Sequence, residues 1–262
     1  MKILKKIIKK IFKKKKRLLD HIYKELVLDV IKKWKWRQTR NSKTLSSFWH
    51  IIEFDVYDRF PLLNMRRIFY KWVIWEFKSL LEDCKTVKEF KDNWCSFWDW
   101  FADKDGNLNL DYAPREQLDY VINLIKKDPT NRRILINLWN HKNLENLSLP
   151  CCHVMYQFYI RDWFIDILWT QRSVDIAIWL PSDMILAALY IIYIWDKTWY
   201  KAWKVMMTFW DAHIYEEHYK LLKETINKKI TKIQPKYIYN NLNNIEIIDY
   251  KPNKTVKFKL KL

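Results

Sequence analysis

The chain has 262 residues, of which 50% are hydrophobic and 17% aromatic, so it is long and apolar enough to bury a large core and is not a disordered chain. Its longest apolar run, residues 184–194, is too short to cross a bilayer, and its lysine-rich start lacks the small-residue cleavage site of a secretory signal. The net charge of +18 favours an anionic ligand, either a nucleotide or a nucleic acid.

The start of the chain is far more basic than the rest. Residues 2–17 contain ten Lys or Arg and no acid, which leaves a net charge of +8 for the remainder. Apolar side chains recur at helical spacing through residues 1–19, with lysines between them. Two interpretations stay open: a solvated, partly frayed extension, or an amphipathic helix that contacts a membrane surface or nucleic acid weakly.

Beyond this extension, hydrophobic periodicity and turn residues predict both helices and strands. In chain order we expect a helix over 20–33, a strand over 45–54, helices over 65–81 and 116–127, strands over 134–138, 156–160 and 165–169, and a buried helix over 182–193. After residue 229 the chain alternates in short strand-like runs. This mixture, with no internal repeat, predicts an α/β or α+β fold.

The cysteines indicate the compartment and exclude one kind of site. Cys84, Cys95, Cys151 and Cys152 form no CxxC pair and no Cys/His set with zinc spacing. We therefore expect a reduced, cytoplasmic chain without a metal site.

Segment 128–183 carries the densest set of reactive side chains. It contains DPTNRRILINLWN (128–140), LPCCHVMYQFYI (149–160) and TQRSVDIAIWLPSD (170–183). A thiol near several guanidinium groups suits attack on an anionic substrate, because positive charge favours the thiolate and arginine donates in bidentate fashion to phosphate. The residues alone therefore favour a cysteine nucleophile acting on a phosphorylated molecule.

The same segment resembles thymidylate synthases and the related deoxycytidylate hydroxymethylases in the order, spacing and identity of its motifs. TLSSF (44–48), FWDWFAD (97–103) and DAHIY (211–215) fall where that family has equivalent segments. The resemblance covers roughly residue 20 to the C-terminus and identifies residues 20–262 as a thymidylate synthase-like catalytic domain. It implies a twisted mixed sheet flanked by helices, with one sheet face forming the interface of a homodimer.

The resemblance also implies the catalytic residues. Cys152 would add to C6 of the pyrimidine, which makes C5 able to attack the methylene group of 5,10-methylenetetrahydrofolate, the co-substrate. Glu76 would relay protons to the base through water, and Tyr112 would assist proton removal from C5. His153 and Asp183 complete the catalytic set.

Binding residues follow from the same resemblance. Arg172 and Ser173 would hold the 5′-phosphate of the nucleotide, together with Arg132 and Arg133 from the partner subunit. Arg40 is the better match for a further phosphate arginine, although Arg37 competes with it. The remaining positions are Gln171 for the substrate, His213 and Tyr215 for the deoxyribose 3′-hydroxyl, and Asp175 and Trp98 for the folate.

The choice of base depends on Asp183, where thymidylate synthases have Asn. An Asn amide both donates and accepts, which suits uracil, whereas a carboxyl group can accept from N4 of cytosine while it shares a proton with N3. We therefore predict folate-dependent C5 hydroxymethylation of dCMP. Two alternatives remain: methylation of dUMP by a thymidylate synthase, and an inactive relative that binds RNA or a membrane through its basic start. Asp183 could also be a simple helix cap.

The chain has one glycine, Gly106, but 16 tryptophans. Several tryptophans align with family glycines (Trp34, Trp49, Trp163, Trp179 and Trp210), with glycine in some members (Trp72 and Trp94), or with contexts typical of glycine turns (Trp36, Trp199 and Trp203). Because glycine serves positive φ and close packing, tryptophan is its poorest substitute in volume. We hypothesise that most of these positions are glycine in the organism, encoded by UGA codons that are read here as tryptophan.

Overall fold

A computed structural model of the chain describes residues 17–33, 35–112 and 115–260. Nearly all of the basic extension over residues 1–19 and one of the tryptophans, Trp34, therefore lie outside the described residues. None of the helices in the described ranges is both long and apolar enough to cross a membrane.

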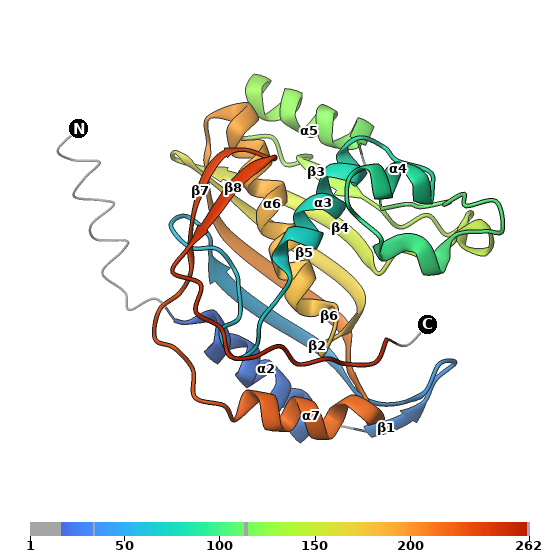
Figure 1. The fold of residues 1–262 in the computed structure, drawn as a ribbon. Helices are drawn as coiled ribbons and strands as arrows, with labels where there is room; N and C mark the ends of the chain where they lie inside the picture. The colour runs from blue at the N-terminus through green and yellow to red at the C-terminus, as the bar shows by residue number, and fades with distance from the viewer. Residues whose placement is uncertain (1–16, 34, 113–114, 261–262) are drawn as a thin grey trace.

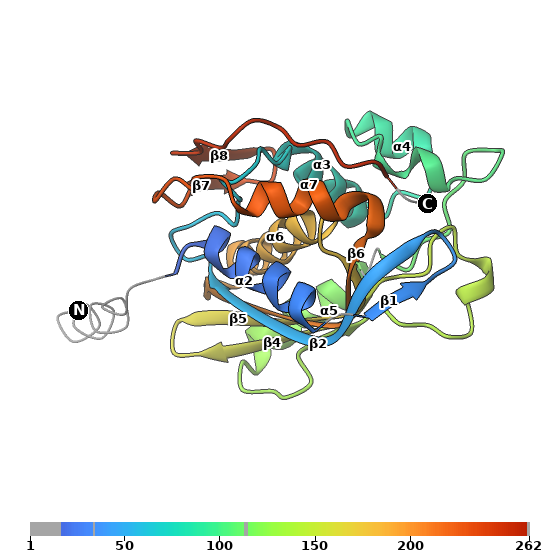
Figure 2. The same ribbon diagram turned by 90° about the horizontal axis from the view of Figure 1, so that it is seen from below.

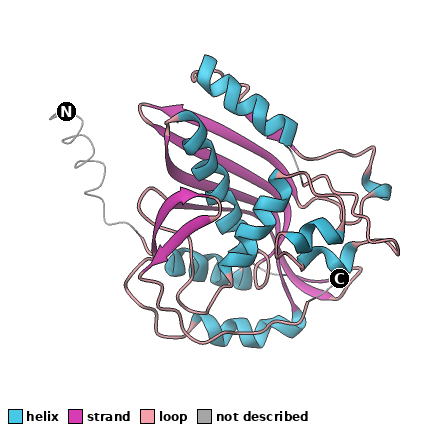
Figure 3. Cartoon of the chain, turned by 45° about the horizontal axis from the view of Figure 1, so that its top comes forward, coloured by secondary structure: helices cyan, strands magenta, loops and turns pink. Residues whose placement is uncertain are grey.

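The core of the fold is a six-stranded mixed sheet (Figure 1). Its strands, in spatial order, are β1 (Lys35–Gln38), β2 (Lys43–Asp55), β6 (Lys201–Tyr215), β5 (Phe164–Asp175), β4 (His153–Arg161) and β3 (Leu135–Asn137). The β5–β6 pair is parallel, and the other four pairs of neighbouring strands are antiparallel. A separate two-stranded sheet pairs β7 (Lys236–Asn241) with β8 (Asn244–Ile248) (Figure 3).

Helices pack against the sheet, as the α/β prediction requires. They are α2 (Leu19–Lys32), α3 (Tyr70–Leu81), α4 (Val87–Asp92), α5 (Arg115–Lys127), α6 (Leu180–Thr198) and α7 (Glu216–Ile226), with short 3-10 turns η1 (Phe97–Phe101) and η2 (Leu144–Asn146). The predicted mixture of helices and a mixed sheet is confirmed.

Helix α6 determines where the site lies. Parallel strands need a crossover connection, and α6 supplies it between β5 and β6. The helix is apolar nearly all round, so most of its residues are buried between the sheet and α3. Its first turn therefore lies near the carboxyl ends of β5 and β6, the usual place for a ligand in a parallel pair.

One face of the sheet is left open. On β2, Ile52 and Phe54 are buried, whereas Ile51 is 57% exposed and Glu53 is exposed. Figure 2 shows α2, α6 and α7 together on the other side of the strands. Because successive side chains of a strand point to opposite faces, the described helices cover one face of the sheet and leave Ile51 and Glu53 exposed on the second, open face.

The structure differs from the predicted elements in one helix start and in two long elements that the prediction lacks. The helix expected over 65–81 begins only at Tyr70, because the N–H groups of Asn64 and Met65 donate to the buried carboxylate of Asp20 instead of starting a helix. Strand β6 and helix α7 were not predicted. The start of β6 is obscured in the sequence by Trp199 and Trp203, whose contexts are typical of glycine turns.

Three tryptophans have the backbone conformation that favours glycine. Trp49, Trp94 and Trp199 have φ of 69°, 64° and 73°. A side chain at such a φ is sterically strained, whereas glycine adopts it freely. All three indoles are largely exposed, so little packing offsets the strain. Trp36 and Trp203, by contrast, lie within β1 and β6, where glycine has no such advantage.

Candidate active site

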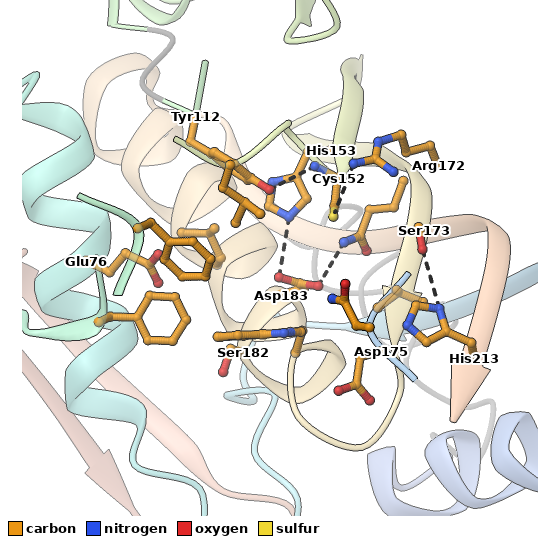
Figure 4. Close-up of a pocket in the computed structure, with 18 of the residues that line it drawn as sticks. Glu76, Tyr112, Cys152, His153, Arg172, Ser173, Asp175, Ser182, Asp183 and His213 are labelled. Atoms are coloured by element: carbon orange, nitrogen blue, oxygen red, sulfur yellow. Dashed lines mark hydrogen bonds and ion pairs between the residues drawn. The ribbon is translucent and has the colours of Figure 1, made fainter. Parts of the chain in front are cut away.

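A cavity of about 260 Å³ opens at the carboxyl ends of β5 and β6, beside the first turn of α6 (Figure 4). All the predicted site residues line it except Arg132 and Arg133. Those that do are Arg40, Glu76, Trp98, Tyr112, Cys152, His153, Gln171, Arg172, Ser173, Asp175, Asp183, His213 and Tyr215. Segments far apart in sequence thus converge on one space that is partly polar and partly apolar.

Cys152 lies directly before β4, with its sulfur 3.9 Å from a guanidinium nitrogen of Arg172. That guanidinium is fixed by hydrogen bonds to the carbonyl oxygens of Cys151 at 2.9 Å and Pro150 at 3.0 Å. The backbone N–H of Cys152 donates to the Tyr112 hydroxyl at 2.8 Å. Burial raises the pKa of the Cys152 thiol, and the charge of Arg172 opposes that rise. The thiol is therefore placed beside a cation that favours its ionisation.

Glu76 approaches the cavity from α3. Its carboxyl group accepts a hydrogen bond from the Trp98 indole N–H at 3.1 Å. Burial, reinforced by the negative charge of Asp183, raises the pKa of Glu76 to about 8. A carboxyl group with such a pKa carries a proton at neutral pH and can give it up, which is the property of a general acid or base.

Asp183 is in the first turn of α6, with its carboxylate inside the cavity. One oxygen accepts from the Gln171 side-chain amide at 2.8 Å, and the other lies 3.4 Å from Nε2 of His153. The N-cap of α6 is Trp179, so the alternative that Asp183 is merely a helix cap is wrong.

A polar cluster forms one end of the cavity. His213 Nδ1 lies 3.4 Å from the Ser173 hydroxyl and 3.0 Å from a carboxylate oxygen of Asp211. Arg40 lines the cavity, whereas Arg37 lies 3.5 Å from Asp211 and does not line it. The structure therefore favours Arg40 over Arg37 as the arginine that reaches a ligand.

The two arginines outside the cavity lie between α5 and β3. Arg132 and Arg133 are both exposed. They do not line the cavity of their own chain, so their predicted contact with the phosphate in a partner subunit stays a prediction.

Asp175 lines another part of the cavity wall. Its carboxylate accepts from the N–H of Ala177 at 2.8 Å and of Ile178 at 3.3 Å, which fixes its orientation. Burial raises its pKa, while the nearby His213 and His218 oppose that rise. The carboxylate is thus held rigidly where it can accept from a ligand.

Much of the remaining wall is apolar and was not predicted. It comprises Asn41, Phe97, Phe101, Leu149, Val174, Ser182 and Leu186, together with Trp179, for which the sequence suggests only a glycine position. The Phe97 and Trp179 rings meet edge to face at 4.5 Å. The FWDWF run was an available signal, because its aromatic residues flank the predicted Trp98.

Comparison with known proteins agrees with this geometry. The family model for thymidylate synthase matches residues 21–262. The chain belongs to the thymidylate synthase family. A thymidylate synthase of Buchnera aphidicola subsp. Schizaphis graminum is 29% identical over 259 residues, which cover 91% of this chain and 98% of that protein. A thymidylate synthase of Coxiella burnetii (strain Dugway 5J108-111) is 28% identical over 234 residues, covering 82% and 89%.

Membership in the thymidylate synthase family makes this chain an enzyme that methylates C5 of a pyrimidine nucleotide with methylenetetrahydrofolate as co-substrate. Hydroxymethylation, which we predicted from Asp183, gains no support from the relatives, since both carry the name thymidylate synthase. Among the described residues, no group of three or more His, Cys, Asp and Glu has the arrangement of a metal site.

Proposed function

We propose that this thymidylate synthase family member transfers a one-carbon unit to C5 of a deoxypyrimidine monophosphate, with Cys152 as nucleophile. The observation that carries the proposal is the placement of the Cys152 sulfur, which lies in the cavity 3.9 Å from Arg172 and shares that cavity with Glu76 and Asp183. Addition of the thiolate to C6 of the base makes C5 nucleophilic. The 5′-phosphate of a bound nucleotide is negatively charged, as the thiolate is. The guanidinium of Arg172 would therefore stabilise both groups.

Proton transfer falls to Glu76 and Tyr112. Glu76 has a pKa of about 8, so it holds a proton for the base at neutral pH and can take it back as the adduct collapses. Tyr112 lies beside the nucleophile, where its hydroxyl accepts from the Cys152 N–H. That position suits a group that assists removal of the proton from C5.

The apolar wall fits the folate co-substrate, which supplies the methylene carbon when bound. Phe97, Trp98 and Phe101 present aromatic rings to the cavity, and a flat heterocycle packs well on such rings. Asp175, with its orientation fixed by two backbone N–H groups, would accept from a ring N–H or amino group. The Trp179 indole occupies part of the same wall, so glycine at this position would enlarge the cavity.

Two bases, uracil and cytosine, are candidates for the nucleotide substrate. The relatives named thymidylate synthase favour dUMP, with methylation as the reaction. A second candidate, hydroxymethylation of dCMP, is favoured by Asp183, because a carboxylate supplies acceptors where an Asn would supply one donor and one acceptor.

The remaining contacts follow the same plan. Arg40, Arg172 and Ser173 would bind the phosphate, Gln171 the base, and His213 and Tyr215 the 3′-hydroxyl. The enzyme would act as a homodimer that packs through the open sheet face, so that Arg132 and Arg133 of the partner subunit complete the phosphate site. Residues 20–262 would form the catalytic domain, with residues 1–19 as an appendage.

Tritium release from 5-tritiated dUMP and dCMP, in the presence of methylenetetrahydrofolate, tests this function. We expect release that is abolished in Cys152→Ser and retained in Cys84→Ala, a buried cysteine that does not line the cavity. The assay should include Trp179→Gly, because the indole narrows the cavity. Absence of release from both nucleotides, in a folded protein with Trp179→Gly, would overturn the proposal.

A further inference from the structure

The carboxylate of Asp183 belongs to a buried chain of three side chains, and Figure 4 shows the first contact of that chain, between Asp183 and His153. Asp183 Oδ1 lies 3.4 Å from His153 Nε2, and His153 Nδ1 lies 2.7 Å from the Tyr156 hydroxyl. Asp183, His153 and Tyr156 are 8%, 4% and 1% exposed. Solvent therefore does not replace a lost partner within this chain of contacts.

The surroundings of Tyr156 determine the direction of its hydrogen bond. Its ring stacks on Trp169 at 3.8 Å and contacts Tyr190 at 5.1 Å, both of them apolar surfaces. In the described part of the chain, its hydroxyl forms one hydrogen bond, to His153. If the hydroxyl accepted from Nδ1, its own hydrogen would be buried without an acceptor, which is costly.

The tautomer of His153 follows from this accounting. The Tyr156 hydroxyl donates to Nδ1, so the imidazole carries its proton on Nε2, which faces Asp183. Gln171 donates to the second oxygen of Asp183 at 2.8 Å. Both carboxylate oxygens then meet protein N–H groups, and the lone pairs that remain on Asp183 are available to the base as acceptors.

We propose that Tyr156 is a positioning residue for base selection, which acts through His153 to present Asp183 to the pyrimidine as an acceptor-only carboxylate. This inference rests on the proposed function, since it assumes that Asp183 meets the base of a bound nucleotide. The base edge it favours is one that carries an exocyclic amine.

An acceptor-only carboxylate distinguishes the two pyrimidines through their ability to bind a proton. Against uracil, one oxygen of Asp183 accepts from N3–H, but the other faces O4, a second acceptor. Against cytosine, one oxygen accepts from the amine, and the other faces N3, which is basic enough to take a proton from solvent and become a donor. When Nε2 of His153 already carries a hydrogen, the imidazole does not take up that proton, and N3 of cytosine can keep it. With Nε2 unprotonated, His153 would compete with N3 for it.

Tyr156→Phe removes the hydroxyl while it keeps the ring. We expect the ratio of kcat/KM for dCMP over dUMP to fall roughly tenfold, the worth of a misdirected hydrogen bond to a charged group. In an Asp183→Asn background, where the amide has its own donor and acceptor, the same Tyr156→Phe change should leave the ratio unaltered. Tyr190→Phe, a neighbouring buried tyrosine outside the Asp183 contacts, is the matched control and should leave the ratio at its parent value.

The two possible failures are distinguishable. Lack of tritium release from both nucleotides by a folded protein with Trp179→Gly removes the proposed function and this inference with it. An active parent in which Tyr156→Phe lowers both kcat/KM values equally, or shifts the ratio as much in the Asp183→Asn background as in the parent, overturns the role of Tyr156 alone. A shift confined to the enzyme that retains Asp183 supports it, because a purely structural defect would not depend on that carboxylate.

Discussion

The Trp98 indole N–H donates to the Glu76 carboxyl group at 3.1 Å, and this contact stands at the junction of α3 and η1 on the cavity wall. A hydrogen bond to the carboxylate lowers the pKa of Glu76, yet burial outweighs it and the pKa rises to about 8. Burial therefore keeps the Glu76 carboxyl group protonated, and it lowers the free energy of unfolding at a pH where the unfolded chain would release that proton.

The first prediction concerns that cost. Because the folded pKa of Glu76 lies above its unfolded value of 4.5, its contribution to stability is fully present below about pH 4.5 and is lost as the pH rises toward 8. Each unit of separation is worth about 1.4 kcal/mol, so the loss amounts to several kcal/mol at most. We expect Glu76→Gln to unfold at a higher temperature than the parent at about pH 8.5 and at a similar temperature at about pH 4.5. An equal difference at both pH values would contradict the assignment.

Thiol reactivity gives the second prediction. Cys152 is half-buried, whereas the other three cysteines are buried, so iodoacetamide should label Cys152 first. Its rate should rise with pH, since burial raises the pKa of the thiol. Arg172→Gln removes the charge that opposes this rise and should slow labelling several-fold at about pH 7.5. Mass spectrometry of the labelled Cys152 peptide measures the labelling rate. Arg37→Gln is the control and should leave that rate unchanged, because Arg37 lies outside the cavity.

The third prediction concerns the C-terminal segment. His218 Nε2 donates to the Lys259 carbonyl at 2.7 Å, and its ring meets that of Phe258 at 5.3 Å. His218→Leu removes this buried anchor, so trypsin should cleave after Lys257 and Lys259 at least several times faster. His21→Leu, at an exposed position of α2, serves as the control. Equal cleavage rates in His218→Leu and the parent would show that the segment is held by other contacts.

The sequence was most informative where the site is built from contiguous residues. Cys152, Arg172 and Asp175 lie in one segment, whose order survives folding because β4 and β5 are paired neighbours. The Asp183 carboxylate also follows from that segment, since α6 begins shortly after β5. Fold class followed from periodicity for the same reason, as each element carries its own local pattern.

What could not be predicted depends on contacts between distant segments. In the sequence, Tyr156 has the pattern of an ordinary inward-facing strand residue. Its hydrogen bond to His153 forms in surroundings that depend on the packing of β4 against α6. The helix start at Tyr70 depends on Asp20, which lies far earlier in the chain and captures backbone N–H groups that periodicity assigns to the helix. The aromatic wall likewise arises from packing rather than from spacing.

The last prediction concerns the tryptophans with positive φ. Replacement of Trp49, Trp94 or Trp199 by glycine should raise the free energy of unfolding by about 1 kcal/mol each, because the left-handed region costs a residue with a side chain about that much. The exposed fractions of 56%, 76% and 87% mean that little burial is lost in exchange. Chemical denaturation of each single variant measures the change.

Trp72→Gly is the matched control for this prediction. Trp72 is 56% exposed but lies inside α3, where glycine is the poorer helix former, so the free energy of unfolding should fall by roughly 0.5 kcal/mol. The coding sequence provides an independent test, because the recoding hypothesis requires UGA at residues 49, 94 and 199. UGG codons there, or at Trp179 and Trp210, would show that the tryptophans are genuine and that the chain tolerates the strain.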